Sequence, residues 1–457
     1  MTSLRNSHLS LSGPSASRLG FDEVLVTVAV LALFFESPDD SLWTKQGFPI
    51  PDLTWVIVGS VVIGRAAYLA LHGRFDLSKP NWREYTVVGL FAVYAVTALA
   101  AAALGHSHPQ PHGKPLVLVS HLAQSVKTFV HFAFLALTAL ILGRFLTPQL
   151  LRRAFVTFFV LAVAAAVIAC LQALDQNVLH TGATGVFDLI SRQTDNFLRP
   201  CSVFSEPAIL GYYMLIGVVV GLWLAAVSPS RWIWLGMGLC IVAALLGAAA
   251  GPAVAFFVGF AFLLWRAWRV LRRSWRELAV IAVVATAVLV FLPVGKTLSD
   301  RATGTGPNAA ASAEFRVKYD HASVKIWQLS PLTGVGLGNN RYYNPALVSF
   351  SNKLNQTEFQ SVNTYLGVLS ESGVFGLLLL TTMLAALFLP FGRVRQEGAW
   401  VTEASILLFI VSFFFINMMA YPIFWFFAGA RLAQLRHLEG LGKSAQQQAE
   451  TPEPMTA

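Results

Sequence analysis

Apolar stretches of about 17 to 25 residues, separated by polar segments, run along most of this chain. A transmembrane α-helix needs about 20 such residues, whereas a transmembrane β-strand shows about ten residues of alternating polarity. In hydrocarbon each backbone polar group must be satisfied within the protein, so stretches of this length favour helices. We expect about twelve transmembrane helices, at residues 19–35, 53–72, 84–104, 115–142, 154–175, 208–228, 232–249, 252–268, 278–295, 362–389, 400–417 and 419–435.

The windows predict an all-α integral membrane protein, a polytopic bundle with a large outer-face loop. We expect a single bundle over residues 1–437, which includes two long outer loops at 176–207 and 296–361. The polar tail at 438–457 is typical of a disordered cytoplasmic segment. The first apolar run is interpreted as an uncleaved helix, because no small-residue cleavage site precedes the acidic stretch that follows it.

The amino-acid composition also indicates that this chain is embedded in a lipid bilayer. Hydrophobic residues make up 56% of the 457 residues and charged residues only 12%, too little polar surface for a soluble fold. The net charge of +9 is typical of nucleic-acid binding or of orientation signals. The basic residues concentrate in the even-numbered short loops, so we favour orientation signals, with both termini in the cytoplasm and no nucleic-acid partner.

Neither a disulfide framework nor a metal site is indicated. Three cysteines cannot form a framework, and two of them lie inside apolar windows. The histidines at 106, 108 and 112 lie in a segment broken by Pro and Gly, with no carboxylate nearby. We expect no metal and no cofactor.

The main polar region lies between Glu314 and Leu380, and it carries the glycine-rich sequence GVGLGN at 334–339. A dinucleotide loop would need a preceding strand and a βαβ unit, which the neighbouring apolar windows exclude. Three glycines at alternate positions permit positive φ and close backbone approach, either to a ligand oxygen or to another helix end. A tight turn alone is the alternative explanation.

Arginines on the outer side are the strongest candidates for binding an anion. Arg199 lies just before an apolar window, and Arg316 precedes an amphipathic stretch. Guanidinium groups bind phosphate oxygens in pairs and keep their charge, so arginines beside lipid suit a lipid diphosphate without a metal. Structural ion pairing, for example of Arg199 with Glu206, is the alternative.

One polar stripe interrupts the apolar window at 362–389. Its members follow the helical spacing i, i+4, i+7, i+8, and are Asn363, Gly367, Ser370 and Glu371. Such a stripe has to face protein or a wet cavity rather than lipid. Ordinary helix packing through small and polar residues would also explain it.

Together these segments resemble the Wzy/O-antigen ligase superfamily of bacterial polysaccharide polymerases and ligases. The resemblance rests on four segments: RPCSVFSEPAILGYY (199–213), Arg316 with PLTGVGLGNN (331–340), NTYLGVLSESGVFGLL (363–378) and YPIFWFFAGARL (421–432). It implies a multi-span bundle whose large outer loop covers a cavity. It also implies glycosyl transfer from undecaprenyl diphosphate at the outer face of the bacterial inner membrane.

One position departs from the family pattern. Members commonly carry His immediately before the Asn at the start of the NTYLG motif, and this chain has Val362 there. A catalytic histidine therefore cannot be carried over. Its absence, and the SEP sequence at 205–207, favour an exopolysaccharide-type polymerase over a ligase that acts on lipid A core.

Roles follow from the chemistry that the resemblance implies. A hydroxyl of one lipid-linked repeat attacks the anomeric carbon of another, and undecaprenyl diphosphate leaves, so the site needs cations and a base. Arg199 and Arg316 are expected to hold the diphosphate, with Arg341 in support. The base is expected to be Glu206, with His321 and Glu371 as alternatives. The residues expected to line the acceptor cavity are Asn363, Ser370 and Asn339.

Two other functions stay open. A ligase that moves finished glycan to lipid A core or protein would share these features and differ in its product. A transporter of lipid-linked sugar would carry charged residues deep in the spans along a through-path. Arg65 and Lys127 lie within spans, but the charge of this chain clusters at one face, which favours an enzyme. The expected partners are an undecaprenyl-diphosphate-linked oligosaccharide, the bilayer and a chain-length regulator.

Overall fold

The protein is all-α apart from one short hairpin, as far as its computed structural model describes it. The described residues are 20–34, 53–73, 82–103, 121–181, 192–194, 197–204, 206–292, 294–305, 307–341, 343, 361–389 and 399–450. The longer α-helices are α1 (Phe21–Ala32), α3 (Leu53–Leu71), α4 (Trp82–Ala103), α5 (His121–Phe145), α6 (Pro148–Leu174), α7 (Pro207–Val227), α8 (Arg231–Leu246), α9 (Ala250–Arg266), α11 (Trp275–Phe291), α12 (Val294–Thr303), α13 (Pro307–Leu329), α15 (Thr364–Phe388), α16 (Trp400–Ser412) and α17 (Pro422–Glu450). The short elements are α10 (Trp268–Arg273), the π-helix η1 (Asp175–Leu179), the 3₁₀-helix η4 (Met418–Ala420), and strands β1 (Arg192–Thr194) and β2 (Phe197–Arg199).

Each predicted apolar window overlaps one of these helices, but fewer of them qualify as membrane spans. Among the described residues, four helices are long and apolar enough to cross a bilayer by themselves: Ser125–Phe145, Pro148–Leu179, Pro207–Val227 and Thr364–Phe388. The bent pair Trp275–Phe291 and Val294–Arg301 would make a fifth. The number of twelve spans is therefore not confirmed and stays a prediction.

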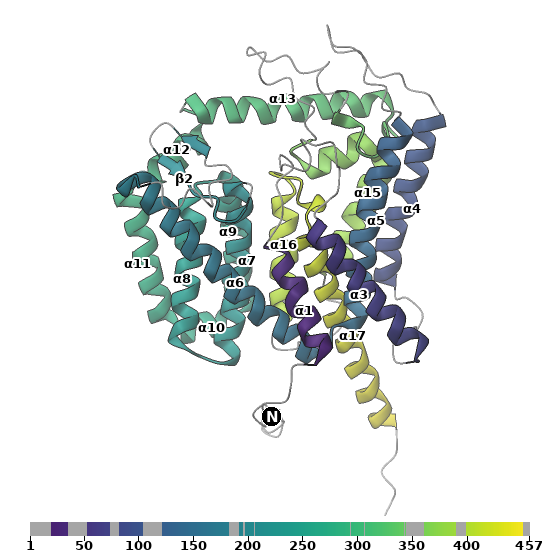
Figure 1. Ribbon diagram of the computed structural model, residues 1–457, viewed down its shortest axis with the longest axis horizontal. Helices are drawn as coiled ribbons and strands as arrows, with labels where there is room; N and C mark the ends of the chain where they lie inside the picture. Colours follow the sequence, from purple (N-terminus) through teal and green to yellow (C-terminus); the bar gives the residue numbers. More distant parts are fainter. Residues whose placement is uncertain are drawn as a thin grey trace, which may run out of the picture.

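The helices stand side by side, and α13 lies across one end of them (Figure 1). Helices α6 to α11 form one side of the molecule, and α3, α4, α5 and α15 form the other. The start of α1 and the free end of α17 lie at the end opposite α13. This arrangement places the polar helix α13 over one end of the bundle.

Aromatic packing joins α6 to α17 and to the end of α1. Phe158 lies 5.2 Å from Phe34 and 5.3 Å from Phe427, measured between ring centroids. Phe155 stacks on Phe427 at 6.1 Å, and these three rings of α6 and α17 are buried. Because aromatic side chains bury large apolar areas, this contact anchors α6 to the C-terminal helix.

The region expected to be a large outer loop contains helices. Of residues 296–361, α12 and α13 take up most of the described part, and residues 344–360 lie outside it. The second outer region, 176–207, contains the β1–β2 hairpin, in which Arg192 pairs with Arg199. The expected tail at 438–457 is described as far as Glu450, and there it continues α17. A polar composition is thus compatible with helices that pack against the bundle end.

Buried ion pairs hold the opposite end of the bundle together. Glu403 of α16, 3% exposed, lies 2.7 Å from Arg266 of α9 and 3.2 Å from Arg431 of α17. Similarly, the Glu84 carboxylate oxygen Oε2 lies 3.0 Å from Nη2 of Arg144. A further pair joins Arg65 of α3 to Asp22 of α1 at 2.7 Å, so Arg65 has a structural partner.

Candidate active site

The glycine loop packs against a kink in α15. Gly334, Gly336 and Gly338 all have positive φ, at 67°, 95° and 75°. The N–H of Val335 donates to the carbonyl of Ser370 at 3.0 Å, and that of Gly336 donates to the carbonyl of Glu371 at 2.9 Å. The expected close backbone approach is therefore made to another helix.

The kink lies at Gly373, which has φ 65° and ψ −165° inside α15. A Cβ at Gly373 would overlap the backbone of Leu332, and a Cβ at Gly334 would overlap the backbone of Glu371. Only glycine fits at either position, because the two backbones touch and both residues are in the left-handed region. The contact fixes the last turn before the kink, which carries Glu371.

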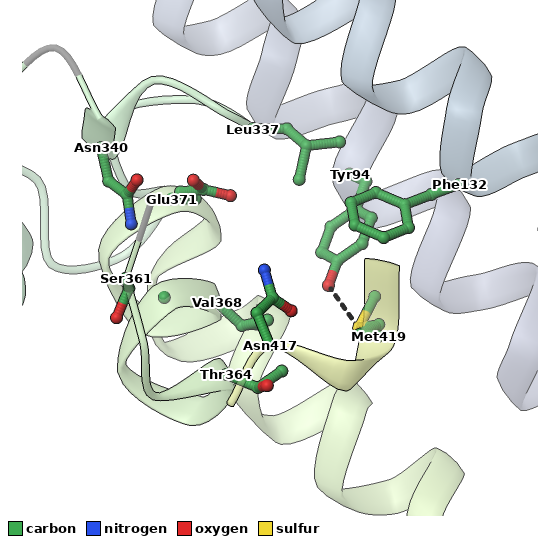
Figure 2. Close-up of a pocket in the computed structure, with 11 residues that line it drawn as sticks. Tyr94, Phe132, Leu337, Asn340, Ser361, Thr364, Val368, Glu371, Asn417 and Met419 are labelled. Carbon is green, nitrogen blue, oxygen red and sulfur yellow. Dashed lines mark hydrogen bonds between the residues drawn. The ribbon is translucent and has the colours of Figure 1, made fainter. Parts of the chain in front are cut away.

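Glu371 lines a small pocket of about 20 Å³, which has room for about one water molecule. Figure 2 shows Glu371 and Asn340 on one side, with Tyr94, Phe132 and Met419 opposite them and Asn417 between. The remaining lining residues are Leu337, Ser361, Thr364, Gly367 and Val368. The pocket combines aromatic faces with amide, hydroxyl and carboxylate groups, a combination that can bind a single hydroxyl group of a sugar.

The loop also holds the carboxylate of Glu371. Backbone N–H groups of Gly338 and Asn340 form hydrogen bonds with it, and the Arg341 guanidinium lies near enough to interact with it electrostatically. The side chain remains partly accessible. An oriented carboxylate on the wall of a polar pocket can accept a proton from a bound hydroxyl.

Asn340 offers a hydrogen-bond acceptor in the same pocket. Its side-chain amide is 1% exposed and donates from Nδ2 to Ser370 Oγ at 3.4 Å. Its Oδ1 has no hydrogen-bond partner among the residues that the structure describes. A buried acceptor without a partner is costly, so this oxygen is well placed for a ligand hydroxyl.

The other predicted lining residues support the pocket from behind. Asn339 donates to Ser125 Oγ of α5 at 3.0 Å, and Ser370 is fully buried. Asn363 caps α15, since its Oδ1 accepts from the N–H groups of Tyr365 and Leu366. Of the predicted stripe, Gly367 and Glu371 line the pocket. The stripe thus faces protein and the pocket, as expected.

Helix α13 reaches the pocket through Ser323, whose Oγ donates to Ser361 Oγ at 3.2 Å. His321 is exposed on this helix and does not line the pocket. Burial raises the pKa of Asp320 above its ordinary value, and nearby Arg316 and His321 oppose that rise. Helix α13 therefore contacts the pocket lining through a hydroxyl pair, and Asp320 lies three residues before Ser323.

The predicted diphosphate-binding arginines lie near the junction of α8 and α9. Arg199, 6% exposed, donates from Nη1 to the carbonyl of Gly247 at 3.4 Å. Arg316 interacts electrostatically with Tyr212 of α7. Tyr212 is buried, and its hydroxyl has no hydrogen-bond partner within the described residues.

A chain of contacts connects this junction to the pocket. A Cβ at Gly251 in α9 would meet the Tyr212 hydroxyl at 2.5 Å and Phe415 at 2.8 Å. Phe415 lies two residues before Asn417, which lines the pocket. Thr364 ties the same segment to α15, because its Oγ1 donates to the carbonyl of Ile416 at 3.0 Å. These contacts connect the α8–α9 junction to the segment that carries Asn417, but neither Arg199 nor Arg316 lines the pocket.

Glu206 occupies a different position. It is the N-cap of α7, with φ −141° and no side-chain capping bond, and it does not line the pocket.

The sequence argument missed Tyr94, Phe132 and Met419, which come from apolar windows far from the polar region. Asn417 had a detectable signal, a lone amide within an apolar run.

No metal site appears in the described part of the chain. Within those residues, no group of three or more His, Cys, Asp or Glu side chains could hold a metal ion. The three histidines at 106, 108 and 112 lie outside it.

Comparison with known proteins gave one family match. A search of curated proteins gave no match. Residues 235–381 match the family model Wzy_C, described as O-Antigen ligase, and this segment contains α13, the glycine loop and the Glu371 turn of α15. Residues 235–381 are thus an O-antigen ligase family domain, which supports the expected relation to the Wzy/O-antigen ligase superfamily.

Proposed function

We propose that this protein is a polysaccharide polymerase that joins undecaprenyl-diphosphate-linked repeat units in the bacterial inner membrane. The end covered by α13 faces the periplasm, and both termini are cytoplasmic. This orientation is supported by the start of α1 and the free end of α17, which both lie opposite α13 (Figure 1). Basic loops at that opposite end agree with the positive-inside rule.

The observation that carries the proposal is the carboxylate of Glu371 on the wall of a polar pocket. Two backbone N–H groups of the glycine loop fix its orientation. Because it faces the pocket, we prefer Glu371 to Glu206 and to the exposed His321 as the base. It takes the role that the family histidine would have at Val362.

In the proposed reaction, the acceptor hydroxyl binds in the pocket against Asn340 and Glu371. As its oxygen attacks the anomeric carbon of the donor sugar, its proton passes to the carboxylate of Glu371. The bond between the anomeric carbon and the diphosphate oxygen breaks, and its electron pair leaves with undecaprenyl diphosphate. The result is a new glycosidic bond and one released lipid carrier.

The leaving diphosphate needs cations as its charge develops. We assign this task to Arg199 and Arg316, with Arg341 close to the base. No metal is needed for this step, because guanidinium groups bind the diphosphate directly.

We call Arg199 and Arg316 the arginine clamp. Its role is tested with Arg199→Ala and Arg316→Ala in a strain that lacks the native copy. Each change is expected to cost about 2 to 4 kcal/mol of transition-state stabilisation, which is roughly 30- to 1000-fold in rate. The chain-length distribution of the surface polymer should then collapse to single repeats. Long polymer from both variants, at normal protein level, would remove the clamp from the proposal. Arg152→Ala, an exposed arginine of α6, serves as the control.

A ligase remains the second candidate, because the matched family model is described as O-Antigen ligase. A ligase would share the base and the clamp and differ only in the acceptor. Loss of the protein would then leave polymer of normal length that is not attached to its acceptor. Under the polymerase proposal, the polymer itself is lost. A chain-length regulator is an expected partner only in the polymerase case.

A further inference from the structure

A separate surface lies at the end of the bundle opposite α13, where α8 begins, α9 ends, α10 lies and α11 begins (Figure 1). It carries five exposed arginines: Arg231, Arg269, Arg272, Arg273 and Arg276. Glu277 is the one acidic residue of the sequence between positions 207 and 299. We call this the basic surface, and its charge is complementary to an anionic ligand.

Four tryptophans are interleaved with these arginines. Trp232, Trp265, Trp268 and Trp275 are 67%, 72%, 54% and 62% exposed. Two of the arginines lie over neighbouring rings: Arg231 over Trp232 at 5.6 Å and Arg276 over Trp275 at 5.7 Å. Tryptophan prefers the headgroup level of a bilayer, where one part of the ring meets lipid and another meets water.

The apolar surface next to the tryptophans indicates how deep in the bilayer they lie. No residue of α11 is buried, and Val280, Val283 and Val290 are 64%, 69% and 68% exposed. From Trp275 to Phe291 this helix rises about 24 Å, close to the thickness of a hydrocarbon core. Lipid chains therefore cover this face, and the basic surface lies beside their headgroups.

Helix α10 is held in position by a short apolar face. Ala267 and Leu271, one helical turn apart, are 3% and 5% exposed. Trp268, Arg269 and Arg272 point away from the protein. By contrast, Arg266 turns inward to Glu403 and is not part of the basic surface.

From this combination we infer that the basic surface is a binding site for anionic phospholipid headgroups in the leaflet opposite α13. The guanidinium groups bind headgroup phosphates, and the tryptophans lie at the boundary between headgroups and acyl chains. The site is distinct from the Glu371 pocket, which lies at the α13 end. Its occupant is a structural lipid, so the inference does not depend on the proposed reaction.

The test uses full-length protein in a neutral detergent with equal amounts of phosphatidylglycerol and phosphatidylcholine. Native mass spectrometry measures the lipid retained. We expect wild-type protein to retain phosphatidylglycerol preferentially, and the triple variant R269Q/R272Q/R273Q to lose this preference by on the order of 100-fold. The variant R269K/R272K/R273K keeps the charge and should retain most of the preference. Lys325→Gln, an exposed cation of α13, should change nothing.

Equal retention of phosphatidylglycerol by wild-type protein and the Gln variant, at equal melting temperature, would overturn the inference. A second arm replaces the lipid with a single-stranded oligonucleotide. Binding of the oligonucleotide that the Gln variant abolishes, without any effect on phosphatidylglycerol, would assign the surface to nucleic acid and would also overturn it.

Discussion

At the scale of single residues, the site depends on backbone contacts that side chains would prevent. Gly334 and Gly373 bring the glycine loop against the kink of α15. The carboxylate of Glu371 is oriented by backbone N–H groups of that same loop. Conformation at two glycines therefore controls the position of the proposed base.

The steric part of this argument is tested by Gly334→Ala. Both Gly334 and Gly304 have positive φ, at 67° and 69°, but only Gly334 has backbone atoms where a Cβ would lie. Gly304→Ala should cost about 1 to 2 kcal/mol of backbone strain. Gly334→Ala should lower the melting temperature further and abolish glycosyl transfer. Equal effects of the two changes, measured by thermal unfolding and product formation, would contradict the contact.

Asp320 makes the stability of the folded protein depend on pH. Burial raises its pKa in the folded protein, so its contribution to stability is present below the unfolded pKa of about 4 and is lost as pH rises through the folded pKa. Asp320→Asn should therefore raise the melting temperature at neutral pH and leave it unchanged near pH 4. Glu314→Gln, an exposed carboxyl of the same helix, is the control. A lower melting temperature of Asp320→Asn at neutral pH would reverse the assignment.

At the scale of elements, the helices at the α10 end are joined by buried charge. Glu403 connects α16 to α9 through Arg266 and to α17 through Arg431, which is fully buried. Arg431 also donates to the carbonyl of Leu387 at the end of α15 at 2.8 Å. One carboxylate thus links three helices and neighbours a fourth.

Glu403→Gln should destabilise the protein strongly. The change leaves two guanidinium groups without a counter-charge, and breaking a buried ion pair from one side costs about 3 to 5 kcal/mol. Thermal unfolding in detergent measures the effect. Glu277→Gln, an exposed carboxyl near the same end, should leave the melting temperature nearly unchanged. If both variants melt alike, the ion pairs do not hold this end together.

At the scale of the whole molecule, the sequence predicted the all-α architecture well and the site only in part. Apolar windows such as 208–228 locate helices because burial in lipid needs a continuous apolar run. The same reasoning treated 296–361 as a loop, because a polar helix such as α13 has no apolar run to detect. Its place across the bundle end comes from tertiary contacts such as that of Ser323 with Ser361.

The choice of base shows the same limit. Glu206 was preferred for its spacing from Arg199, which is visible in sequence. Glu371 lines the pocket because the loop at 334–340 returns to α15, and because Tyr94 and Asn417 close the opposite wall. Contacts between segments so far apart leave no local pattern.

The most direct measurement of the central proposal is the rate of polymer formation by purified protein in proteoliposomes supplied with undecaprenyl-diphosphate-linked repeat units. Glu371→Gln keeps the shape of the side chain and removes the base, so the rate should fall by about 100- to 10000-fold. Glu206→Gln should keep most of the activity. A Glu371→Gln protein that forms polymer at the wild-type rate would contradict the account.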